Sequence, residues 1–220
     1  MGARAWEPVG VTSEAGTAGD RRAKGRPRAT SPAALERLAF ELFARQGFDE
    51  TTVDDIAAAA GIARRTFFRY FSSKNDLVWG DFEGQLRRLR GLLDGTDPRT
   101  PMMDAVRRAV VEFNRFDPQE VPWHRQRMEL ILGVPTLQAD ATLRYASWRA
   151  VIAEFVAGRT GVPASAAVPR LAGHLVLAAA VSAYEHWLAC EGRAALDDLL
   201  DEAIRHLSAG LASVPGDTAS

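Results

Sequence analysis

The segment 48–77 constrains the fold of this chain more than any other part of it. It contains two short stretches with helical spacing, and Gly61-Ile62-Ala63 between them predicts a tight turn. Either Thr51 or Thr52 can cap the first stretch with its side-chain hydroxyl. Two short helices joined by a glycine turn are typical of a helix-turn-helix, whose second helix enters the major groove of DNA.

A longer helix is expected before this unit, beginning at Ser31-Pro32 and ending at Gly47. Phe67 and Phe71 are four residues apart, so both should pack inward on that helix. The intervening arginines should then face outward. The third helix is expected over 64–71 and a fourth, capped by Ser72-Ser73, over 74–94.

Positive charge gathers around the same unit. Residues 21–74 hold eleven Lys and Arg against six Asp and Glu, whereas the whole chain carries a net charge of −1. A basic segment beside an acidic remainder fits a polyanion such as DNA, although on charge alone a solvated surface explains it equally well.

The rest of the chain predicts helices near 101–116, 122–133, 136–159, 164–190 and 194–212, and shows no strand-like alternation. The fold class is therefore expected to be all-α. The expected organisation is a disordered tail (1–20), a basic arm (21–30), a helix-turn-helix domain (31–77), a helical ligand-binding and dimerisation domain (78–214) and a short tail (215–220).

Composition excludes several other classes. The single cysteine, Cys190, permits no internal disulfide, and we find no apolar run long enough for a membrane span and no signal peptide. We therefore expect a cytoplasmic protein without a membrane partner. The four histidines form no metal-binding pattern, and no catalytic motif or cofactor-binding motif is present, so we expect no enzyme, metal or cofactor.

Over about residues 31–77 the chain resembles the TetR family of transcriptional regulators. The segments that carry this resemblance are LFARQGFDETTVDDIAAAAGI and TFFRYFSSKNDL. The resemblance implies that Thr52 caps the N-terminus of the second helix next to a DNA phosphate. It also implies that Thr66 and Tyr70 face DNA and that Lys74 contacts a DNA phosphate. With the arm and the exposed arginines, the expected contacts to double-stranded operator DNA are Arg26, Arg28, Thr52, Arg64, Arg65, Thr66, Arg69, Tyr70 and Lys74.

Three positions depart from the family pattern. Ala63 stands where a hydroxyl residue usually caps the recognition helix, and Phe68 stands where tyrosine is frequent. Arg65 replaces a small residue, which suggests an unusual operator contact.

A narrower resemblance covers VEFNRFDPQEVPWHRQRMELILGVPTLQA, LRYASWRAVIAEFVA and FRYFSSKNDLVWGDF. These words look like the TetR-type regulators that accompany mycofactocin biosynthesis genes. The resemblance implies a repressor of such genes that a small amphipathic effector, such as a long-chain acyl-CoA, releases from its operator.

Most of the large aromatic residues in the expected domain 78–214 should simply be part of its hydrophobic core. Each of its arginines, taken singly, is more often a surface residue. Some of these residues could instead line an apolar cavity between helices, with an arginine holding an anionic group. The candidates are Trp123, Arg127, Met128, Tyr145, Trp148, Arg149 and Trp187.

The stretch 171–190 is apolar nearly all round, so it should be buried on every side. A homodimer formed through helices near 164–190 and 194–212 buries it more naturally than a monomer. Two other functions remain open: a helical enzyme with a site assembled from distant segments, and a protein-interaction module with an incidental basic tip. Salt-sensitive binding to duplex DNA would separate the regulator from both.

Overall fold

The structure is a computed structural model that describes residues 31–190 and 193–210. The expected tails 1–20 and 215–220 and the expected basic arm, with Arg26 and Arg28, lie outside the described residues. The described part is helical and contains no strand, as expected. Its helices are α1 (Pro32–Gln46), α2 (Val53–Ala59), α3 (Arg64–Phe67), α4 (Lys74–Trp79), α5 (Phe82–Asp94), α6 (Met102–Phe113), α7 (Val121–Gly133), α8 (Pro135–Thr160), α9 (Ala167–Ala189) and α10 (Leu196–Ser208).

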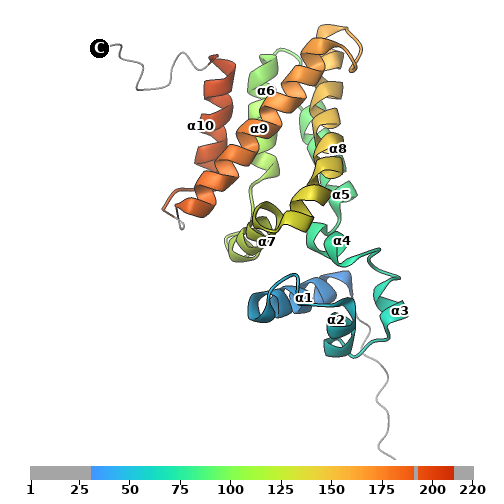
Figure 1. The fold of residues 1–220 in the computed structure, drawn as a ribbon. Coiled ribbons are helices and arrows are strands. Elements are labelled where there is room, and N and C mark those ends of the chain that lie inside the picture. Colours follow the sequence, from blue (N-terminus) through green and yellow to red (C-terminus); the bar gives the residue numbers. More distant parts are fainter. Residues whose placement is uncertain (1–30, 191–192, 211–220) are drawn as a thin grey trace, which may run out of the picture.

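Helices α1–α3 form a head at one end of the molecule, and α5, α6, α8, α9 and α10 form a helical body at the other (Figure 1). Helices α4 and α7 lie between them. Side-chain caps begin α1, α2 and α4 as expected: Ser31, Thr52 and Ser73 accept hydrogen bonds from the backbone N–H three residues ahead.

Two expected helices are shorter than the sequence indicates. The expected helix over 74–94 is divided, because Gly80 adopts a φ of +61° that ends α4. The side chain of Asp81 then accepts from Gly84 N–H and begins α5. The third helix, expected over 64–71, ends as α3 at Phe67, and residues 68–70 form turns.

The head does not have a core of its own. Phe40, Phe67 and Leu77 are buried in one cluster that also contains Ile131 of α7 and Leu137 of α8. The rings of Phe40 and Trp123 also meet there, with centroids 4.4 Å apart. The hydrophobic core of the head therefore continues through the expected domain boundary at 77/78.

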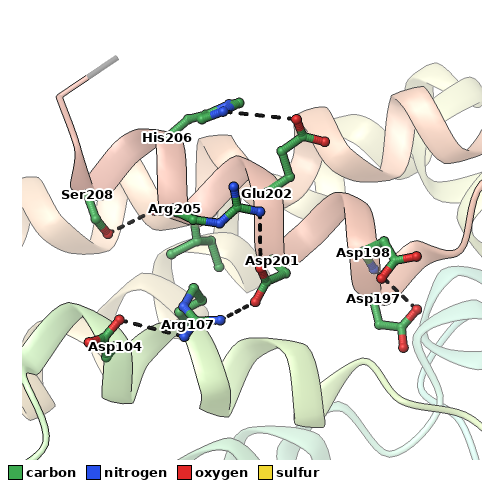
Figure 2. A network of polar contacts seen from close by, with 10 residues as sticks. Asp104, Arg107, Asp197, Asp198, Asp201, Glu202, Arg205, His206 and Ser208 are labelled. Carbon is green, nitrogen blue, oxygen red and sulfur yellow. Dashed lines mark hydrogen bonds and ion pairs between the residues drawn. The ribbon is translucent and has the colours of Figure 1, made fainter. Parts of the chain in front are cut away.

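The body is a bundle in which α9 packs against α8 and α10 around a second core. A Cβ added at Gly173 of α9 would lie 2.6 Å from the carbonyl oxygen of Arg149, so glycine permits the close crossing of α8 and α9. Figure 2 shows Arg107 of α6 between Asp104 and Asp201, an ion-pair network that fixes α10 to α6.

Contrary to the expectation that no apolar run is long enough for a membrane span, helix α9 meets that test by length and composition. One face of it, with Val176, Ala180 and Ala183, lies in the core of the body. Its position in the bundle explains that part of its apolar character.

Candidate DNA-binding face and ligand cavity

The outer face of α3 and the turn after it carries the expected recognition residues. Phe67 and Phe71 are buried, as predicted, and Phe68 is 44% exposed. The three expected DNA-contacting arginines of this segment, Arg64, Arg65 and Arg69, are exposed, whereas Thr66 and Tyr70 are half-buried. The amphipathic reading of this segment is therefore confirmed.

The three arginines of this face differ in what they contact. Arg64 forms an exposed ion pair of 2.6 Å with Asp54 of α2 and lies over the ring of Phe68. Arg69 lies over the ring of Tyr70. Within residues 31–190 and 193–210, Arg65 forms no hydrogen bond or ion pair. Arg65 therefore offers its whole guanidinium group to a partner.

The side chains of Thr52 and Lys74 form hydrogen bonds that stabilise the head. The Thr52 hydroxyl accepts from Asp55 N–H, and the Asp55 carboxylate accepts from Thr52 N–H, which completes a capping box. The Thr52 hydroxyl also donates to the Asp55 carboxylate at 2.6 Å, and this bond, followed by the one from Thr52 N–H, lowers the pKa of Asp55. Lys74 donates to the carbonyl oxygens of Phe48 and Thr51, at 2.6 and 2.8 Å, and more weakly to that of Asp49.

Burial lowers the pKa of Lys74. Its ammonium group has three donors, and all three point to backbone carbonyls. A phosphate contact by Lys74 would require one of these bonds to open, so that contact remains a prediction. Ala63 begins α3 without a side-chain cap, as its departure from the family pattern implied.

A cavity of about 150 Å³ lies in the body. Four of the seven expected ligand-binding residues line it: Arg127 and Met128 from α7, and Tyr145 and Trp148 from α8. The sequence reasoning missed the other aromatic and polar residues of its wall, which come from α4, α5, α6, α7, α9 and the segment after α6. These are Trp79, Phe82, Gln85, Phe113, Asn114, Phe116, His124 and Tyr184.

The structure places the other three expected residues away from this cavity. Trp123 packs against Phe40 in the core of the head. Arg149 lines a separate surface hollow with Arg170 and His174. Trp187 lines a wider groove that opens beside the cavity, and the guanidinium of Arg125 lies over its ring.

That groove has a volume of about 710 Å³ and is basic. Arg115, Arg125 and Arg193 line it together with one acid, Asp197. Arg115 and Arg125 also form ion pairs, with Glu112 and Glu129, at the edge of the groove. The groove and the cavity share Asn114, Phe116 and His124 as a common wall. The rings of Phe116 and His124 are stacked with their centroids 3.8 Å apart, so this pair of rings separates the cavity from the groove.

His124 is held by a buried chain of hydrogen bonds. The Tyr184 hydroxyl donates to Asn114 Oδ1 at 2.6 Å, and the Asn114 amide donates to the carbonyl of Val110. The hydroxyl has one proton, so His124 Nε2–H donates to Tyr184 Oη at 2.7 Å. Burial, and secondly the charge of Arg127, lowers the pKa of His124 to about 3, so the ring is neutral near pH 7.

Two ion pairs connect the wall of the cavity to the head side of the molecule. Arg127 donates to Glu36 of α1 at 2.7 Å and lies over the ring of Phe40. Arg144 of α8 pairs with Asp76 of α4 and lies over the ring of Trp79. Arg127 therefore joins the wall of the cavity to α1, and Arg144, which lies over the wall residue Trp79, holds α4.

Comparisons with known proteins give the family of the chain. Residues 37–78 match the profile of the tetR family of bacterial regulatory proteins, and residues 100–212 match that of the MftR C-terminal domain. The chain is 49% identical, over 85% of its length and 94% of the relative, to a Mycobacterium tuberculosis protein named as the mycofactocin biosynthesis transcriptional regulator MftR.

Solved structures share the fold. The FadR repressor of Thermus thermophilus, solved in complex with lauroyl-CoA, has a TM-score of 0.53 and 22% identity over 86% of this chain and all of its own. FadR of Bacillus subtilis, solved with stearoyl-CoA, has a TM-score of 0.57 and 15% identity over 80% of this chain and 97% of its own. This chain is a transcriptional regulator rather than an enzyme, and it belongs to the TetR family, in the group with an MftR-type C-terminal domain.

Proposed function

We propose that this protein is a dimeric repressor that binds operator DNA through its head and leaves it when an amphipathic effector enters the body. The observation that carries the proposal is the Arg127–Glu36 pair, which joins the wall of the cavity to the first helix of the head. An effector changes DNA affinity only if it binds one conformation better than the other. A contact shared by the cavity and the head gives it the means to do so.

The proposed DNA contacts are the exposed arginines of the recognition segment, together with Thr52, Thr66, Tyr70, Lys74, Arg26 and Arg28. Arg65 supports the proposal most directly, because its fork can donate twice to guanine O6 and N7. The test is a salt titration of binding to the protein's own promoter DNA. Affinity should fall with a log–log slope of about −0.9 for each phosphate contacted. A flat slope would contradict DNA binding and would favour a function as a protein-interaction module.

The proposed effector class is a long-chain acyl-CoA. The basic groove would hold the phosphates on Arg115, Arg125 and Arg193, and the cavity behind Phe116 and His124 would receive the chain. The cavity is about the size that accepts a benzene ring, so a long chain requires this pair of rings to move and the two hollows to join. The acyl-CoA complexes of the two FadR proteins support the same ligand class for this fold.

The effector test is release from promoter DNA by lauroyl-CoA, with hexanoyl-CoA and free CoA as controls. Each buried methylene contributes about 0.8 kcal/mol, so lauroyl-CoA should act at a much lower concentration than hexanoyl-CoA. Equal release by free CoA would contradict a role for the cavity. No release by any of the three would reject this effector class and leave DNA binding intact.

The proposed dimer forms through α9 and α10, within the expected ranges 164–190 and 194–212. The exposed faces of these helices form an apolar groove of about 420 Å³ that includes Ala178, Ala179 and Leu199. Leu175, which also lines this groove, is 42% exposed, and Leu171 before it on α9 is 57% exposed. A second copy of the chain would cover this surface and explain the apolar character of α9 that the body core leaves unexplained.

The proposed target genes are those of mycofactocin biosynthesis, on the basis of the 49% identical relative. The proposed location is the cytoplasm, where promoter DNA is available. Footprinting on the promoter nearest such genes tests the first statement. Protection at unrelated promoters alone would contradict it.

A further inference from the structure

Three buried polar atoms among the described residues have no hydrogen-bond partner: Nε1 of Trp79, Nε of Arg127 and Oη of Tyr145. All three side chains line the same cavity. Buried polar atoms normally have a partner, because burial removes their bonds to water. The gathering of all three at one cavity indicates that a ligand completes it.

The chemistry of these atoms defines what the ligand must carry. The N–H groups of Trp79 and Arg127 can only donate a hydrogen bond. The Tyr145 hydroxyl can donate or accept, and burial, with the nearby Glu185 carboxylate as a second cause, raises its pKa, so it keeps its proton. The three groups together require an acceptor with more than one lone pair.

The surrounding charges favour a neutral acceptor over a carboxylate. Arg127 is already paired with Glu36, and Arg144 is paired with both Asp76 and Asp140. The two cations are therefore compensated, and a ligand carboxylate would bring an unbalanced charge into a buried site. The remaining wall is largely apolar and includes Phe82, Leu86, Met128, Ile131 and Leu177. Its other polar side chains are the exposed Gln85 and the hydrogen-bonded group of His124, Tyr184 and Asn114.

We propose that Trp79, Arg127 and Tyr145 form a recognition subsite for a neutral oxygen, a hydroxyl or a carbonyl, on the apolar part of the effector. The inference rests on the proposed function and adds that an unoxidised hydrocarbon end is the poorer ligand. Occupation also bears on the head, because Arg127 holds Glu36 of α1 and Trp79 ends α4. The subsite therefore lies where binding and DNA affinity can be coupled.

The test uses probes that fit a cavity of this size, phenol and toluene, with benzoate as the carboxylate, titrated calorimetrically into the full-length protein. Water solvates phenol better than toluene, so a purely apolar cavity prefers toluene. We expect phenol to bind at least tenfold more tightly than both toluene and benzoate. A preference for toluene, or for benzoate, would overturn the proposal.

Tyr145→Phe removes one hydroxyl and leaves the ring in place. We expect the phenol-to-toluene preference to fall at least threefold and the Tm without probe to stay the same or rise. Tyr184→Phe is the comparator, because that hydroxyl is bonded to Asn114 and its loss should lower the Tm. A Tm loss in Tyr145→Phe as large as in Tyr184→Phe would mean that the Tyr145 hydroxyl has a partner already, and would overturn the subsite.

Promoter release by lauroyl-CoA and 12-hydroxylauroyl-CoA separates this inference from the proposed function. The subsite predicts release at a lower concentration of the hydroxylated ester, and a smaller difference in Tyr145→Phe. Equal release by both esters without a phenol preference overturns the subsite and leaves the acyl-CoA effector standing. If neither ester releases DNA while phenol keeps its preference, the acyl-CoA effector is wrong and the subsite stands.

Discussion

The recognition face of the head and the cavity of the body differ in whether their polar groups have hydrogen-bond partners. In the head, Thr52 is closed in a capping box and Lys74 is bonded to backbone carbonyls, while Arg65 stays in solvent. In the cavity, polar atoms of Trp79 and Tyr145 are buried without partners. The polar groups of Thr52 and Lys74 thus have hydrogen-bond partners before DNA binds. The polar atoms of the cavity obtain partners only when a ligand binds. Mutations should therefore affect the two regions through different measurements.

The largest expected effect comes from the body surface. Ala178→Glu places a charge in the exposed groove between α9 and α10, where a second copy would bury it unpaired at a cost of several kcal/mol. Ala178 is preferred to Ala179, which packs partly on the core of the body. We expect monomers by sedimentation and loss of tight operator binding, because the two heads are no longer linked.

Ala139→Glu is the matched control. It is the same substitution at an exposed position of α8 that does not line the groove, and we expect it to leave the dimer intact. A folded dimer in Ala178→Glu would place the interface elsewhere.

The next effect belongs to the head alone. Arg65→Ala should weaken binding to the preferred operator by about 1–3 kcal/mol and relax the choice of one base, without changing the Tm. Arg45→Ala, at an exposed position of α1, removes the same charge and should leave base preference unchanged. Equal weakening on all DNA sequences, measured by competition binding, would make Arg65 a phosphate contact.

A change of pH should act on the body. Since the pKa of His124 is lowered to about 3, the unfolded chain takes up a proton below pH 6.5 that the folded protein excludes. Stability is therefore lost as the pH falls from about 6.5 towards 3, by roughly 2 kcal/mol between pH 7 and pH 5. His124→Gln keeps a donor for Tyr184 and should show a smaller loss in urea unfolding. An identical loss in both proteins would contradict the buried neutral ring.

The smallest effects concern the caps of the head. Thr52→Ala should lower the free energy of unfolding by about 1 kcal/mol, because α2 loses its capping box. Ala63→Ser supplies the side-chain cap that α3 lacks and should raise it by a smaller amount. Thermal unfolding measures both, and a stabilising Thr52→Ala would show that the capping box is dispensable.

The head could be predicted from the sequence because its determinants are local. Caps lie three residues from the N–H groups they bind, and the spacing of Phe67 and Phe71 gives the buried face directly. The division of the helix at Gly80 was missed, because an isolated glycine within a helical pattern does not reveal its φ. Lys74 was assigned to DNA, and its bonds to the carbonyls of Phe48 and Thr51 depend on a turn 23 to 26 residues away.

The cavity was only half predicted, because its wall comes from six helices and the segment after α6. Large aromatics on α7 and α8 could be named, but the sequence does not show which face of each helix meets α4 or α9. Trp123 was therefore assigned to the ligand although it packs on Phe40. No sequence pattern indicates the role of His124, its neighbour, because the bond of His124 to Tyr184 spans 60 residues.

The continuous core between the head and α7 and α8 limits how this regulator can be recombined with others. A head cut at residue 77 would expose Phe40 and Leu77 to water where Ile131 and Leu137 now cover them. Such a fragment would lose part of its hydrophobic stabilisation and tend to aggregate. A hybrid that gives this DNA specificity to another sensor would have to carry α7 and the first turns of α8 along with the head. The unit of exchange, in the laboratory or in evolution, is therefore larger than the DNA-binding motif.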